Sequence, residues 1–138
     1  LLIWGAFALA IPITFLADWI IYILYGKAYI ESVIILKIYV WAGIFVFMSV
    51  ANNKWMVIEN FQKYILLTAL LGMCSNIILN VILIPRYGAT GAAFATLISY
   101  GIGSYICLLF FPKIRAGFWF ATKSLNPYSV FAFSYYLK

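Results

Sequence analysis

The sequence predicts an all-α integral membrane protein: a bundle of four transmembrane helices followed by an interfacial C-terminal tail. Of the 138 residues, 67% are hydrophobic and only 9% are charged, whereas about 25% of the residues of an ordinary soluble domain are charged. The apolar residues form long stretches with almost no charge, and a helix needs about 20 such residues to cross a bilayer. Aromatic residues make up 20% of the chain, which suits a protein that occupies two membrane interfaces.

The four apolar stretches form one predicted transmembrane unit over residues 1–111. The predicted spans are 1–24, 32–51, 64–84 and 88–111. Pro12 lies inside the first span and is expected to kink it, which a membrane helix tolerates. The second span is expected to end at the polar pair Asn52 and Asn53, and the third at Pro85. Because so few residues separate the third span from the fourth, these two spans are expected to form an antiparallel hairpin.

Residues 112–138 have a different pattern and predict a basic interfacial tail. Lys113, Arg115 and Lys123 are interspersed with aromatic residues, a pattern typical of a short helix that lies on the membrane surface. The apolar stretch 128–137 is too short to span the bilayer. It is either a second interfacial segment or a divergent end of the chain.

The basic residues predict the orientation of the bundle. They occur singly between apolar stretches, which argues against a nucleic-acid partner despite the net charge of +6. With alternating spans, one side of the membrane receives Lys54, Lys63, Lys113, Arg115, Lys123 and Lys138, and the other receives Lys27, Lys37 and Arg86. Basic residues are enriched on the cytoplasmic side. The C-terminus is therefore expected in the cytoplasm, in a multi-pass protein of the bacterial cytoplasmic membrane.

The composition offers little for catalysis, metal binding or a cofactor. The chain has no His and only three acidic residues, so general acid–base chemistry and metal ligation have few candidate groups. Cys74 and Cys107 lie in apolar stretches without a CxxC motif, and each is interpreted as a small packing residue. We expect no enzyme activity and no cofactor.

Small and polar residues recur at every fourth position on the third and fourth spans. The third span carries Thr68, Gly72, Asn76 and Asn80, and the fourth carries Gly91, Ala95, Ser99, Gly103 and Cys107. Such stripes let two helix backbones approach closely in lipid, so a packing seam is the favoured interpretation. The alternative is a polar face on a transport cavity. Asn76 and Asn80 are then the best candidates, because an amide in hydrocarbon needs a partner.

Asp18 and Lys37 are charged residues within predicted spans. By their distance from the ends of the first and second spans, both lie about 8–9 Å inside the same membrane face, so that they could form an ion pair. Such residues usually face the bundle interior and often mark a transport pathway. The alternative is that Asp18 lies at the interface and that Lys37 extends its side chain to it.

The stretch 76–99 resembles a hairpin of the Wzx-type polysaccharide and O-antigen flippases, a branch of the multidrug/oligosaccharidyl-lipid/polysaccharide exporter superfamily. The matching residues are Asn76, Leu79, Asn80, Leu83, Ile84, Pro85, Tyr87, Gly88, Gly91, Ala92, Ala93, Ala95, Thr96 and Ser99. The segment Tyr25-Gly26-Lys27-Ala28-Tyr29 and the basic residues after Phe111-Pro112-Lys113 are also similar to that family. The resemblance covers roughly residues 1–125.

The resemblance implies that the chain is the C-terminal portion of a larger two-lobe transporter whose N-terminal helices precede it. Such a transporter flips oligosaccharide on a polyprenyl pyrophosphate lipid between leaflets by alternating access, as in O-antigen and lipopolysaccharide biosynthesis. Lys37 and Lys54 are then the possible contacts to the pyrophosphate. The alternatives are a multidrug or small-molecule exporter of the same superfamily, and a small membrane subunit without a transport role.

Overall fold

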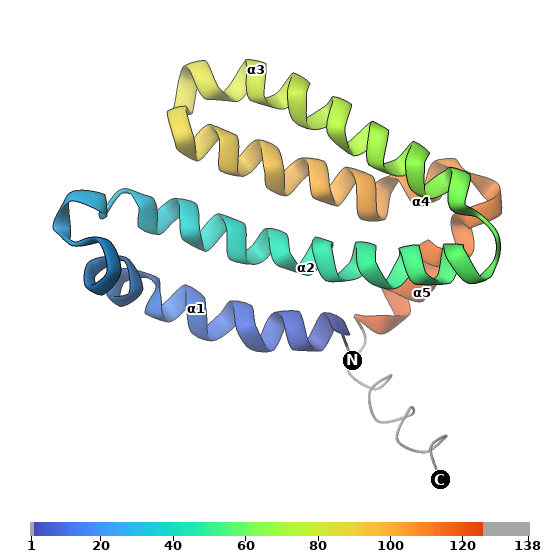
Figure 1. The fold of residues 1–138 in the computed structure, drawn as a ribbon, viewed down its shortest axis with the longest axis horizontal. Helices are drawn as coiled ribbons and strands as arrows, with labels where there is room; N and C mark the ends of the chain where they lie inside the picture. Colours follow the sequence, from blue (N-terminus) through green and yellow to red (C-terminus); the bar gives the residue numbers. More distant parts are fainter. Residues whose placement is uncertain (1, 126–138) are drawn as a thin grey trace, which may run out of the picture.

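A computed structural model describes residues 2–125 of the chain, and it is an all-helical bundle in which long helices lie side by side (Figure 1). The apolar stretch 128–137 and Lys138 lie outside the described residues. The elements are α1 (Leu2–Tyr25), η1 (Lys27–Tyr29), α2 (Ser32–Ile58), α3 (Gln62–Gly101), the π-helical turn η2 (Ile102–Ile106), α4 (Cys107–Phe110), η3 (Pro112–Ile114) and α5 (Arg115–Ser124).

The helices α1 and α2 are antiparallel neighbours. α1 continues through Pro12 and ends before Gly26, whose φ of 78° is a left-handed conformation that commonly terminates helices. A buried cluster of Ala17, Ile21 and Val33 holds the two helices together near this turn. Ala17 has no exposed surface, which shows how closely the two helices approach.

The second helix is longer than the sequence predicted. It was expected to end at residue 51, but α2 continues through Asn52 and Asn53 for about two further turns, to Ile58. The two amides are accommodated because each finds a partner: Asn52 Nδ2 donates to the Ser104 carbonyl at 3.1 Å, and Asn53 Nδ2 to Ser49 Oγ at 3.4 Å. Polar residues therefore belong to the body of this helix.

The third helix folds back on itself, so that one helical stretch supplies two crossings. A mainly apolar helical stretch of 49 residues runs from Gln62 to Phe110. It would measure about 74 Å as a straight helix, against a hydrocarbon core of about 30 Å. Gly88, with φ 56° and ψ −137°, interrupts the helical conformation. The chain reverses there, between a first arm (residues 62–87) and a second arm (89–101) (Figure 1).

The expected end of the third span at Pro85 is therefore wrong by about one turn. Pro85 lies inside the helix, and the reversal occurs at Gly88. A proline removes one backbone N–H but keeps a helical φ, whereas the reversal needs a positive φ that glycine adopts without a steric penalty. Among the described residues, three helices are long and apolar enough to span a membrane, and the hairpin in the third gives the bundle its fourth crossing.

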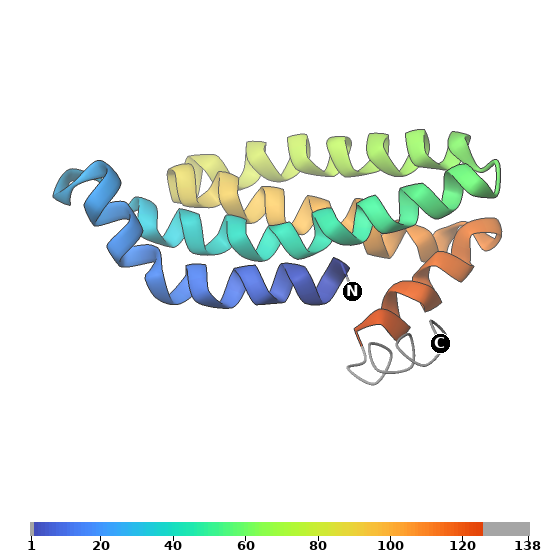
Figure 2. The same cartoon turned by 60° about the horizontal axis from the view of Figure 1, so that its bottom comes forward.

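The bundle is open, and α2 lies between α1 and the second arm of α3 (Figures 1 and 2). Its clusters of buried residues are small. One comprises Ile3, Ala6, Ile44, Met48 and Ala121, and another comprises Met56, Leu108 and Ile114. Large apolar side chains such as Phe15 (78% exposed) and Val81 (70%) lie on the outer faces. Such faces suit lipid or further transmembrane helices.

The helix α5 crosses the end of the bundle near the start of α1 (Figure 2). Its buried face, with Gly117 and Ala121, packs against the bundle, and the Tyr105 hydroxyl lies 2.9 Å from Thr122 Oγ1. Trp119 is 59% exposed. The tail was expected to form a short helix on the membrane surface, and in the structure part of this helix is covered by the bundle itself.

Candidate functional site

A cavity of about 460 Å³, lined by both polar and apolar residues, lies between α2, both arms of α3 and the π turn η2. α2 contributes two side chains, and the arms of α3 and η2 contribute the others. The lining residues, none of which is charged, are Ser49, Asn53, Ile65, Thr68, Ala69, Gly72, Met73, Asn76, Thr96, Ser99, Tyr100, Gly103 and Ser104. Hydroxyl and amide groups thus gather in one place within an otherwise apolar bundle.

The cavity lies in the middle of the helices, away from their ends. Along the first arm of α3, Thr68 is about 9 Å and Asn76 about 21 Å from Gln62. These depths fall inside the hydrocarbon region of a membrane that the arm spans. Polar side chains at such depths face the interior of a bundle or a water-filled space. We infer that the open side of the cavity faces protein or water and is shielded from lipid.

The π turn η2 forms one wall of the cavity. π-helical turns are rare and occur frequently at functional sites. Ser104 lies in this turn and lines the cavity, and its carbonyl accepts the hydrogen bond from Asn52 Nδ2. Asn52 is only 6% exposed. This buried bond ties the middle of the π turn to α2 and fixes the wall relative to the opposite side of the cavity.

Asn76 and Asn80 form a hydrogen-bonded pair on the first arm of α3. Asn80 Nδ2 donates to Asn76 Oδ1 at 2.8 Å. Asn76 lines the cavity, whereas Asn80 lies one turn beyond it, and the buried Asn80 Oδ1 has no hydrogen-bond partner among the described residues. Of the two amides predicted to line a cavity, Asn76 therefore does so, whereas Asn80 lies outside the lining and donates a hydrogen bond to Asn76.

The small residues of the two stripes meet where the arms of α3 and the π turn cross. An ideal Cβ placed on Gly72 would lie 3.5 Å from Gly103 Cα and 3.5 Å from the Ser99 carbonyl oxygen. Ala95 lies on the same stripe and has no exposed surface. Gly91 has a different environment, because a Cβ there would overlap the Leu83 carbonyl across the turn. Packing and cavity lining thus coincide at Gly72, Ser99 and Gly103.

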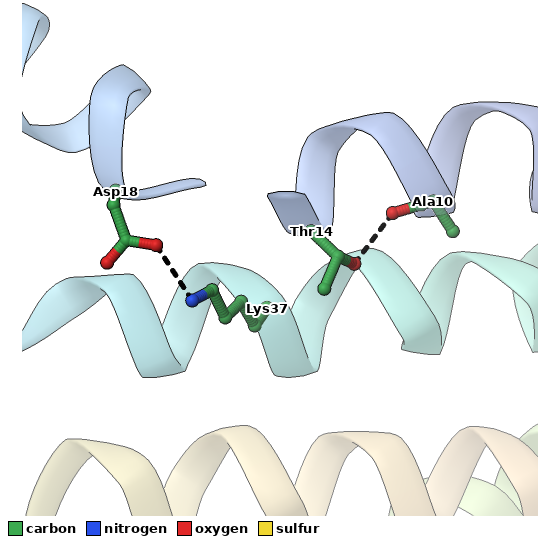
Figure 3. Close-up of polar contacts among 4 residues, drawn as sticks. All are labelled: Ala10, Thr14, Asp18 and Lys37. Atoms are coloured by element: carbon green, nitrogen blue, oxygen red, sulfur yellow. Dashed lines mark hydrogen bonds and ion pairs between the residues drawn. The ribbon is translucent and has the colours of Figure 1, made fainter. Parts of the chain in front are cut away.

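Asp18 and Lys37 form an ion pair between α1 and α2 (Figure 3). Lys37 Nζ lies 2.9 Å from Asp18 Oδ2, and one turn earlier on α1 Thr14 donates to the Ala10 carbonyl at 2.6 Å. The side chain of Asp18 is 65% exposed and that of Lys37 36%. An ion pair this exposed within spanning helices is unfavourable against lipid. Its face therefore requires water or further polar protein groups.

Removing one member of this pair should impair insertion more than removing both. We expect Asp18→Asn and Lys37→Met each to lower the amount of membrane-inserted protein several-fold. Each variant leaves the other residue of the pair as an unpaired charge within the membrane. The double variant should recover much of that loss. Quantitative immunoblots of washed membranes measure the yield, and a double variant no better than the worse single variant would show that the pair contributes nothing.

Lys54 is not part of the cavity. It is exposed on α2, next to the cavity residue Asn53, and it is absent from the lining. Within residues 2–125, no group of three His, Cys, Asp or Glu side chains is placed to hold a metal ion. The cavity therefore offers hydrogen bonding by uncharged groups together with apolar contact.

Several cavity residues were missed at the level of sequence, although a signal for them exists. Ser49 and Asn53 are four residues apart, as are Tyr100 and Ser104, which is the spacing of side chains that share one face of a helix. The expected end of the second span at residue 51 placed Asn52 and Asn53 in a loop and hid this pattern. Correct helix lengths would have brought Ser49 and Asn53 into the predicted polar face.

Comparison with known proteins gives one partial similarity. A stretch of 55 residues, 40% of the chain, is 46% identical to the probable flippase AglR of Haloferax volcanii, and it covers 10% of that protein. No family model matches the chain, and no solved structure matches it. That protein is named as a probable flippase, and the chain spans only a small part of its length. The similarity does not extend to the O-antigen branch that the sequence resembles.

Proposed function

We propose that the chain is the C-terminal portion of a transporter that flips lipid-linked oligosaccharide across the cytoplasmic membrane by alternating access. The observation that carries the proposal is the stretch 46% identical to a protein named as a probable flippase. The substrate would be oligosaccharide on a polyprenyl pyrophosphate carrier. The remaining helices of the same transporter would cover the exposed apolar faces, and the C-terminus would lie in the cytoplasm.

The hydroxyl and amide groups of the cavity support this proposal. A flippase must carry a hydrophilic head group through the hydrocarbon region, where each unpaired polar group costs free energy. A cavity lined by hydroxyl and amide groups at the depth of Thr68 to Asn76 offers hydrogen-bond partners along that route. The exposed Asp18–Lys37 pair is a second polar feature that requires water or protein at its face.

The alternative of a multidrug exporter has less support. A cavity that takes up cationic compounds is expected to present acidic groups that balance the charge of the substrate. Among the described residues the acidic side chains are Asp18, which is bonded to Lys37, and Glu31 and Glu59, which are exposed at helix ends. None of these lines the cavity.

Reconstitution into lipid vesicles tests the proposal. The reading frame is extended upstream of the codon for Leu1, and the encoded protein and the 138-residue chain are reconstituted separately with a fluorescent polyprenyl-pyrophosphate oligosaccharide. Dithionite, which does not cross the membrane, then bleaches the label in the outer leaflet. We expect the longer protein to expose nearly all of the label, and the 138-residue chain to leave the inner-leaflet half protected, because one lobe cannot alternate.

Each of the other results has a definite meaning. Flipping by the 138-residue chain alone would overturn the assignment of this chain to one lobe. A longer protein that moves cationic dyes and leaves the lipid-linked sugar protected would favour the multidrug alternative. Absence of both activities would favour a subunit without a transport role.

A further inference from the structure

We infer that the cavity between α2, α3 and η2 is a binding site for a neutral sugar unit, and that it does not bind the phosphate groups of the carrier lipid. The physiological source of that sugar, a lipid-linked oligosaccharide, rests on the proposed function. The inference itself rests on the size of the cavity, its hydrogen-bonding groups and its lack of charged side chains.

The size of the cavity suits a small polar ligand. Its volume of about 460 Å³ falls within the range of about 300–1,000 Å³ that is usual for small-molecule sites. Its lining residues on the first arm of α3 run from Ile65 to Asn76, about 16 Å at the helical rise. A cavity of this length accommodates one or two sugar rings, whereas an extended polyprenyl chain is longer.

The cavity presents many hydrogen-bond acceptors. Four lining hydroxyls donate their proton to a carbonyl of their own helix, and each keeps lone pairs directed away from that bond. These bonds are Thr68 to Ile65, Thr96 to Ala92, Ser99 to Ala95 and Ser104 to Tyr100. Asn53 adds its side-chain carbonyl, since only its Nδ2 is used, toward Ser49. A ligand rich in O–H donors would satisfy these acceptors.

The cavity also presents hydrogen-bond donors. Asn76 accepts through Oδ1 from Asn80, an arrangement that leaves the two Nδ2 protons of Asn76 available to a ligand. The Ser49 hydroxyl accepts from Asn53 and keeps its own proton, and the Tyr100 side chain lines the same wall. The cavity lining thus includes both donors and acceptors. Sugar hydroxyls both donate and accept, so a sugar matches both kinds of group at once.

An anionic ligand does not match the cavity. No Lys or Arg lines it, and a phosphate group taken from water into an uncharged site at this depth would lose its hydration without an opposite charge in exchange. Lys37 is engaged with Asp18 between α1 and α2 (Figure 3), while the cavity lies on the α3 side of α2. The phosphate groups must therefore be neutralised elsewhere in the transporter.

Methionine methyl resonances provide the test. The chain has three Met residues: Met73 lines the cavity, while Met48 and Met56 are 3% and 1% exposed in separate apolar clusters. The full chain, labelled with ¹³C at the Met methyls and held in lipid nanodiscs, is titrated with a mixture of methyl glycosides of the common neutral hexoses and N-acetylhexosamines. Inorganic pyrophosphate is titrated separately.

We expect the glycosides to shift the Met73 signal saturably while Met48 and Met56 stay in place, and pyrophosphate to leave all three unchanged. Absence of a glycoside shift, an equal response to pyrophosphate, or a common shift of all three signals would each overturn the inference. The vesicle experiment is independent of this result. Flipping without glycoside binding would refute the sugar site alone, and binding without flipping would refute the proposed function alone.

Variants of the cavity and a matched control outside it locate the site. Asn76→Leu keeps a side chain of similar size but removes the free amide, and should weaken glycoside binding about tenfold, equivalent to two ordinary hydrogen bonds. Gln62→Leu removes the same group from an exposed position at the start of α3 and should leave the affinity within about twofold. If Asn76→Leu does not fold, Thr96→Val, which conserves shape, should still weaken binding several-fold. Unchanged affinity in a folded cavity variant would contradict the site.

Discussion

Gly91→Ala is expected to disrupt the hairpin between the two arms of α3. A Cβ on Gly91 would overlap the Leu83 carbonyl group and would approach Tyr87 Cβ within 3.1 Å. The obstructing atoms at Leu83 belong to the backbone, so no side-chain rotation can relieve the overlap and the turn around Gly88 must open. We expect a loss of about 2–3 kcal/mol in stability, as for other overpacked buried sites. Unfolding in sodium dodecyl sulfate, followed by circular dichroism, measures it.

Gly43→Ala is the matched control for this substitution. Gly43 lies within α2, and a Cβ placed on it would meet nothing within 4 Å. Alanine is a better helix former than glycine by roughly 0.8–1 kcal/mol, so that this variant should be as stable as the parent or slightly more stable. Equal stability of Gly91→Ala and the parent would show that the approach of Leu83 to Gly91 is not tight.

The helical bundle could be predicted from the sequence because each membrane-spanning helix needs a run of about 20 mainly apolar residues, and such runs are visible in the sequence alone. A run of apolar residues from Gln62 to Phe110 cannot fit one crossing of a bilayer, so a reversal within it follows from length alone. The position of the reversal, however, does not follow from length. Pro85 and Gly88 are both plausible breaks, and only the backbone conformation shows that Gly88 has the positive φ.

The end of α2 could not be predicted, because it depends on a contact distant in sequence. Asn52 and Asn53 have low helix propensity and predict an end. The helix continues because the Ser104 carbonyl, 52 residues away, accepts a bond from Asn52. That carbonyl lies in a π turn, which has no sequence signature comparable to a proline or a terminal glycine. Tertiary contacts of this kind override local propensity.

The candidate site was partly accessible from the sequence. The spacing of Thr68, Gly72 and Asn76 predicted one face of a helix, and that face lines the cavity. The packing and cavity interpretations were treated as alternatives, whereas Gly72 and Gly103 serve both: they let the arms approach and leave open space beside the contact. A stripe indicates which residues share a face, but the volume beside it depends on the crossing geometry of a second element.

Gly72 offers a graded test of this crossing. A Cβ at Gly72 would lie 3.5 Å from Gly103 Cα and from the Ser99 carbonyl oxygen, an ordinary van der Waals distance. The stability of Gly72→Ala should therefore lie within about 1 kcal/mol of that of the parent. This range includes the gain from the higher helix propensity of alanine. Gly72→Leu adds carbons that meet backbone on the facing element and should lose about 2–3 kcal/mol by the same measurement in detergent. Because only the larger side chain separates the arms, equal stability of the two variants would mean that close backbone contact does not hold the hairpin together.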